Sequence, residues 1–215
     1  MKKITFNRIF LKSLISNRNF RLKLSLVLGS LVNFVYILGN IFSVLFCHSI
    51  WAATLTVYHL VLALIRLYIL SSRLSDAGEK EKRNLCFRIG VFMLLLDIAS
   101  AFLMISSISR GFYVKYSGVI LLGFSIYTGY SVTKSIVDMR RHANDKRQVH
   151  YAARNISLSA SLMSLFNLQY SLLSVLGADF KLISYVVFLC GLMVFATIFG
   201  LSLRLILSGR GSLFR

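Results

Sequence analysis

Three ionisable side chains lie inside long apolar stretches of the sequence, where a charge is costly. His59 and Arg66 fall in the run "LTVYHLVLALIRLYIL", and Asp97 falls in "FMLLLDIASAF". Ionisable groups at membrane depth usually face the interior of a helix bundle, and they mark proton or ion pathways. These residues are therefore the first candidates for chemistry, and the elements that carry them decide what they can do.

The composition of the chain is typical of a membrane protein. The 215 residues are 57% hydrophobic and 15% charged, with a mean hydropathy of +0.73, whereas a soluble domain has about 25% charged residues. Apolar runs of about 20 residues can cross a hydrocarbon core of about 30 Å. Such runs predict six spans, at 24–47, 51–72, 86–108, 116–137, 156–176 and 182–207. We expect an all-α, polytopic six-helix transmembrane bundle.

The basic residues are distributed unevenly, and their distribution predicts an orientation. Of the 25 Lys and Arg residues, all except Arg110, Lys115 and Lys181 fall on one predicted side of the spans. The positive-inside rule makes that side cytoplasmic, so both termini are expected in the cytoplasm and the spans in the plasma (inner) membrane. The net charge of +18 then suits a lipid bilayer with an anionic inner leaflet rather than nucleic acid.

The chain divides into a basic N-terminal segment, a six-span transmembrane domain and a short cytoplasmic tail, at 1–23, 24–208 and 209–215. Apolar residues recur at helical spacing among the Lys and Arg of the first segment, at Phe6, Ile9, Phe10 and Leu14. This pattern is typical of an amphipathic helix that lies on the inner membrane surface. A disordered basic tail fits the same residues, and both interpretations stay open.

The rise of an α-helix places the three ionisable residues at defined depths. At about 1.5 Å per residue, His59 lies about 12 Å from the outer end of its span, and Asp97 lies about 14 Å from the outer face. Because the two are nearly level on helices joined by a short loop, we expect His59 to face inward toward Asp97. Arg66 lies about 9 Å from the inner end of its span. It is expected to reach the cytoplasmic interface or to fold toward Asp97.

The fifth predicted span carries a polar face. Its Ser and Asn residues recur at intervals of three and four and therefore share one side of a helix: Ser157, Ser161, Ser164, Asn167, Ser171 and Ser174. Such a face must point into the bundle, where it serves helix packing or lines a polar cavity. Asn33 and Tyr127 lie near the same depth as Asn167. The candidate intramembrane polar site is therefore His59, Asp97, Asn33, Ser161, Ser164, Asn167 and Arg66.

Motifs of catalysis are missing from the sequence. It has no clustered pair of carboxylates, no His-Glu-x-x-His and no glycine-rich phosphate loop, and its four histidines are scattered. We therefore expect no enzyme, and we assign no catalytic, cofactor-binding or metal-ligating residue.

The layout resembles the membrane domain of the cation diffusion facilitators, with six spans, a very short first outer loop and a longer basic loop between spans four and five. Residues of spans two and five follow the family's outline: Ser49, Ala52, Ala53, His59, Leu158, Ala160 and Ser171. The aspartate of the family's second-span His-x-x-x-Asp is Ala63 here, and its fifth-span pair is Ser164 and Leu168. From the sequence we expect no counterpart of the family's cytoplasmic metal-binding domain. The resemblance implies a facilitator-like bundle with a degenerate metal site.

Three functions are open on this basis. The first is a non-enzymatic membrane partner or atypical transporter, as a homodimer or with a partner membrane protein. The second is a cation- or proton-coupled secondary transporter that uses His59 and Asp97. The third is the membrane substrate-binding subunit of an energy-coupling-factor importer, although the first span shows no clear alanine-rich docking motif.

Overall fold

The computed structural model describes residues 18–47, 49–71, 78–109, 118–141, 148–175 and 180–210. Within these ranges the chain forms six long α-helices: α2 (Arg18–Cys47), α3 (Ile50–Ser71), α4 (Glu79–Ser109), α5 (Gly118–Arg141), α6 (Gln148–Val175) and α7 (Phe180–Gly209). The all-α prediction is confirmed for the described residues.

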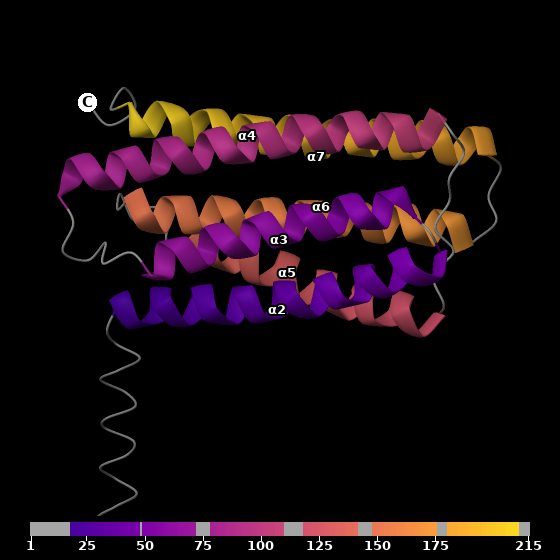
Figure 1. Cartoon of the computed structure of the whole chain (residues 1–215), viewed down its shortest axis with the longest axis horizontal. Helices are drawn as coiled ribbons and strands as arrows, with labels where there is room; N and C mark the ends of the chain where they lie inside the picture. The colour runs from indigo at the N-terminus through magenta and orange to yellow at the C-terminus, as the bar shows by residue number, and fades with distance from the viewer. Residues whose placement is uncertain are drawn as a thin grey trace, which may run out of the picture.

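The helices lie side by side along one common axis, and consecutive helices run in opposite directions (Figure 1). The closest pairs are α4 with α7, α2 with α3, and α5 with α6. Helices α3 and α6 occupy the middle of the bundle, between the α4–α7 pair on one side and α2 with α5 on the other. The side chains of α3 and α6 are consequently the best placed to form an interior site.

Each helix coincides with a predicted span but several extend beyond it at one end of the bundle. Helix α4 begins at Glu79 rather than at Cys86, and α6 begins at Gln148 rather than at Ile156. Hydropathy detects only the apolar part of a helix, whereas backbone hydrogen bonds continue through charged residues. Helix α2 begins at Arg18, so the end of the segment expected at 1–23 continues the first span. The rest of that segment lies outside the described residues, as do residues 211–215 of the tail.

Four of these helices are long and apolar enough to cross a membrane. The candidate spans are Leu26–Phe46 in α2, Ile50–Ser71 in α3, Glu79–Ile108 in α4 and Ile183–Gly209 in α7. Helices α5 and α6 fall outside this set. In α6 the reason is the polar face, since its Ser and Asn residues lower the hydropathy of the whole helix. These four candidate spans indicate a membrane location.

The surface of the bundle is unusually apolar. Phe102 of α4 is 71% exposed, Val119 of α5 is 81% exposed and Leu31 of α2 is 60% exposed. Monomeric soluble proteins rarely expose contiguous apolar surface on this scale, whereas hydrocarbon is a favourable solvent for it. Many Ser and Asn side chains are buried inside instead. This inverted arrangement agrees with helices that associate in lipid through small and polar residues.

Helices α4 and α7 approach one another closely where α4 carries a glycine. A Cβ atom added at Gly90 would lie 2.9 Å from the backbone nitrogen of Ile206. Only a residue without a side chain fits this contact, as at other close helix crossings in membranes. The α4–α7 pair is thus held by a close approach of the two backbones.

A polar cluster inside the bundle

Tyr36 of α2 connects four helices at the centre of the bundle. Its ring stacks on Tyr127 of α5, with the centroids 4.6 Å apart, and contacts His59 of α3 at 4.4 Å. The amide Nδ2 of Asn167 in α6 donates a hydrogen bond of 2.8 Å to the Tyr36 hydroxyl. The Tyr36 side chain is 2% exposed, so these contacts form in a dry interior.

Two further hydrogen bonds complete the arrangement. The indole Nε1 of Trp51 donates to Oδ1 of Asn167 over 3.1 Å, and the Tyr127 hydroxyl donates to Oδ1 of Asn33 over 3.1 Å. We name this group the central polar cluster: Asn33, Tyr36, Trp51, His59, Tyr127 and Asn167. Sequence reasoning included Asn33, His59 and Asn167 and placed Tyr127 at their depth, but it missed Tyr36 and Trp51. The spacing of Asn33 and Tyr36, three residues apart on one helical face, is the signal that could have found Tyr36.

His59 faces inward as expected, but it has no polar partner within the described part of the chain. Its side chain is completely buried, and neither Nδ1 nor Nε2 forms a hydrogen bond there. A neutral imidazole always offers one donor and one acceptor, and buried polar atoms in native proteins are nearly always satisfied. His59 is held by the tyrosine rings on either side, Tyr36 and Tyr58.

Arg66 is also buried, which corrects the expectation that it reaches the interface. The residue is 4% exposed. Its Nη1 donates a hydrogen bond of 2.6 Å to the carbonyl oxygen of Gly29 in α2, and its Nη2 donates one of 3.3 Å to the hydroxyl of Ser157 in α6. A Cβ atom at Gly29 would lie 2.9 Å from Nη1. Glycine at this position therefore lets the guanidinium reach the α2 backbone. Arg66 donates to the Gly29 carbonyl there and not, as expected, to water at the membrane interface.

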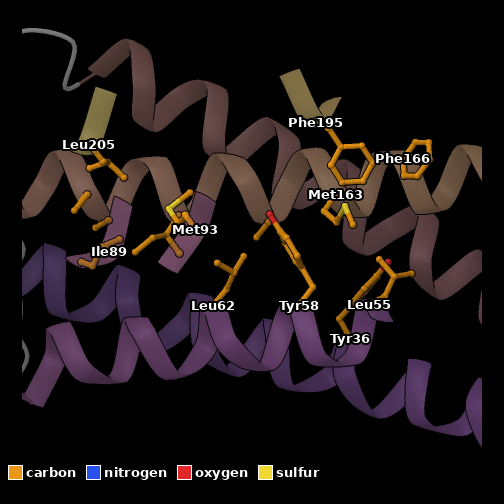
Figure 2. Packing of buried hydrophobic residues seen from close by; sticks show 14 of the residues in the cluster. Tyr36, Leu55, Tyr58, Leu62, Ile89, Met93, Met163, Phe166, Phe195 and Leu205 are labelled. Atoms are coloured by element: carbon orange, nitrogen blue, oxygen red, sulfur yellow. The ribbon is translucent and has the colours of Figure 1, made fainter. Parts of the chain in front are cut away.

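Asp97 lies on the opposite side of α3 from the central polar cluster. It is 3% exposed, and its Oδ1 has no hydrogen-bond partner among the residues described. It interacts electrostatically with Tyr58 of α3. Figure 2 shows Tyr58 leaving α3 between Met93 and Met163. Successive helical residues point about 100° apart, so Tyr58 faces α4 and α6 while His59 faces Tyr36. The expected pairs of Asp97 with His59 and with Arg66 are therefore not formed.

The serine face of α6 packs against α5. The Ser161 hydroxyl lies 2.7 Å from that of Ser135 and 2.8 Å from that of Ser131. Ser135 also donates to the carbonyl oxygen of Ser157 over 3.2 Å. We name these four residues, Ser131, Ser135, Ser157 and Ser161, the α5–α6 serine cluster. The inward orientation of this face is confirmed, because Ser161, Ser164, Asn167, Ser171 and Ser174 are all buried.

The described residues do not fit a divalent metal. No group of three or more His, Cys, Asp or Glu residues occurs in the parts of the chain described. Zinc sites need three or four such ligands. Ala63, at the place of the facilitators' second-span aspartate, is a buried core residue. Within the described residues His59 belongs to no such group, and its ring contacts those of Tyr36 and Tyr58.

Fold and interior together define a class, a helical protein with candidate membrane spans and a polar cluster enclosed by four helices. No family model matches the chain, and neither the curated proteins nor the solved structures give a match.

Proposed function

We propose that the chain is a six-span integral protein of the plasma (inner) membrane, with both termini in the cytoplasm. The antiparallel order of the six helices supports this, because the beginning of α2 and the end of α7 lie at the same end of the bundle (Figure 1). Basic residues of four helices belong to that end: Lys80, Arg83, Arg88, Arg140, Arg154 and Arg210. Their concentration at one end is what the positive-inside rule requires of a cytoplasmic face.

The two helices outside the set of candidate spans fit this proposal for different reasons. Helix α6 is enclosed by the other helices and buries its polar residues, so it needs little apolar surface of its own. Helix α5 exposes large apolar side chains at spacings of three and four residues, at Val119, Leu122, Ile126 and Tyr130. Such a stripe is suited to lipid.

Labelling of single cysteines tests the orientation. In a cysteine-free background, Lys181→Cys and Lys80→Cys place one thiol at each end of the bundle, and both positions are exposed. An impermeant maleimide added to intact cells is expected to label position 181 at once and position 80 only after permeabilisation. The reverse pattern, or labelling of both positions in intact cells, would contradict two cytoplasmic termini.

We further propose that the protein is an atypical, non-enzymatic transporter whose interior site is centred on His59. The observation that carries this proposal is the completely buried imidazole, whose two nitrogens have no hydrogen-bond partner among the described residues. A histidine that only packs would gain from a hydrogen bond. One that takes up and releases a proton needs its nitrogens available to a transient partner, and proton relays in transporters are commonly built from His and Asp.

Asp97 would be the second titratable group of this transporter. Its buried Oδ1 is also free of described partners, and it lies on the other side of α3 at a similar depth. Tyr58 directly precedes His59 in α3 and interacts electrostatically with Asp97. A proton that moves between the two groups would have to pass α3, so we expect the two residues to act in different conformations and not as a fixed pair.

Proteoliposomes with a trapped pH indicator test the transport proposal. With an imposed pH gradient and a potassium clamp, the full chain is expected to equilibrate protons faster than protein-free vesicles, and His59→Leu is expected to lose this activity. His150→Gln, at the basic end of α6, is the matched histidine control and should behave as the wild type. Flux equal to that of empty vesicles, or unchanged flux in His59→Leu, would refute the proposal and favour a structural membrane partner.

A facilitator-like fold remains part of the proposal, with its metal site lost. Adding zinc to the same vesicles, loaded with a trapped zinc indicator, tests whether the metal site is lost. We expect no zinc uptake above that of protein-free vesicles. Uptake that depends on His59 would instead indicate a working facilitator site.

A further inference from the structure

The interior contains a cluster of hydrogen-bond donors that faces no carboxylate of the described residues. Arg66 carries a permanent positive charge and is 4% exposed. None of the acidic side chains that the structure describes forms an ion pair with it. Its Nε is buried without a hydrogen-bond partner in the described residues. A cation enclosed in this way is unfavourable unless an anion approaches it.

Two more donors lie on the same side. Asn33 follows Gly29 by one turn of α2 and so lies beside the guanidinium bound to the Gly29 carbonyl. Its Nδ2 is buried with no partner in the described part of the chain, although its Oδ1 accepts from Tyr127. His59 precedes Arg66 by two turns on the same face of α3, and it interacts electrostatically with Arg66.

We infer that this face of α3, between His59 and Arg66, binds a small carboxylate anion. Arg66 would hold the carboxylate through its Nε and the second N–H of its Nη2, because Nη1 is engaged by Gly29 and the other N–H of Nη2 by Ser157. This edge of a guanidinium matches the two oxygens of a carboxylate. Asn33 Nδ2 would donate to the same anion, and His59 lies at its outer side. The inference rests on the proposed transport site and names the chemical class of its substrate.

The single tryptophan of the chain provides the readout. Trp51 is hydrogen-bonded to Asn167 within the central polar cluster, so its emission reports on the interior. Full-length protein in nanodiscs is titrated with sodium acetate in place of sodium chloride at constant ionic strength. We expect a saturable change in emission, and a melting temperature that rises with acetate because the ligand binds only the folded state.

Variants of Arg66 make the test specific. Arg66→Gln is expected to raise the half-saturating acetate concentration at least about tenfold, and Arg66→Lys to raise it too, since an ammonium lacks the planar fork. Arg88→Gln removes an exposed arginine and should leave the half-saturating acetate concentration unchanged. If Arg66→Gln does not fold, Gly29→Ala serves instead, because it displaces the guanidinium and keeps the charge.

Two results would overturn the inference: no saturable response of the wild type when acetate replaces chloride, or an equal response in Arg66→Gln. These results are distinguishable from a failure of the transport proposal. If proton flux depends on His59 but acetate does not bind, only the proposed anion site is refuted. Acetate binding that depends on Arg66 without any flux would refute transport and leave the anion site in place.

Discussion

Two polar regions of the same bundle are built in opposite ways. In the α5–α6 serine cluster the hydroxyls of Ser131, Ser135 and Ser161 each have another hydroxyl or a carbonyl as partner within 3.2 Å. The Ser157 hydroxyl accepts a hydrogen bond of 3.3 Å from Arg66. On the face of α3 that carries His59 and Arg66, buried nitrogens lack partners within the described residues. Satisfied polar groups hold helices together, whereas unsatisfied ones cost free energy that packing alone does not explain. The contrast separates an interior contact that is structural from one that we propose to be functional.

The largest effect on stability is expected in the central polar cluster, at Asn167. Asn167→Ala removes the acceptor of the Trp51 indole and the donor to the Tyr36 hydroxyl at once. We expect a loss of about 2 kcal/mol in the free energy of unfolding, because two buried groups lose a partner. Thermal unfolding in detergent measures it, and Trp51 emission should shift as well. Asn84→Ala, at an exposed position of α4, is the control, and equal stability of the two variants would contradict the central polar cluster.

A smaller effect is expected at the contact of Arg66 with α2. In Gly29→Ala the new methyl group would lie 2.9 Å from Nη1, so the guanidinium must move away from the carbonyl. We expect a loss of about 1 kcal/mol, the size of a mild overpacking. Gly123→Ala has nothing within 4 Å of its added atom and should be neutral. A neutral Gly29→Ala would show that Arg66 is not held at this carbonyl.

Removing one hydroxyl from the serine cluster should cost less still. Ser161→Ala deletes the group shared by Ser131 and Ser135, and interhelical hydrogen bonds in membranes are worth about 0.6 kcal/mol on average. Ser159→Ala deletes an equally buried hydroxyl without a described partner and should cost nothing. Both variants are expected to keep proton flux, and a loss of flux in Ser161→Ala would place transport in the serine cluster.

Replacing His59 with leucine should change stability least of all. The imidazole gives no hydrogen bond to the described residues, so an apolar side chain of similar size is expected to keep the free energy of unfolding within about 0.5 kcal/mol or to raise it. Chemical denaturation of His59→Leu beside the wild type measures this difference. A marked loss of stability would show that His59 is a packing residue with a partner.

The comparison also shows how far the sequence alone could lead. Apolar runs located all six helices, and the rise per residue correctly brought Asn33, Tyr127 and Asn167 to one level, because length and depth are properties of a single helix. What a side chain contacts depends, in addition, on which helices flank its own helix. The sequence therefore placed His59 and Asp97 at similar depths and predicted that they pair. In the structure His59 leaves α3 on the side that faces Tyr36, away from Asp97. Arg66 was expected at the interface because no sequence pattern reveals that the Gly29 carbonyl is within its reach.

Proton flux through His59→Leu, measured in vesicles containing variant protein of verified stability, tests the central claim most directly. We predict that flux falls to the level of empty vesicles while the unfolding transition stays at its wild-type position. Flux at the wild-type rate from a stable His59→Leu would contradict the claim and assign the buried imidazole to packing.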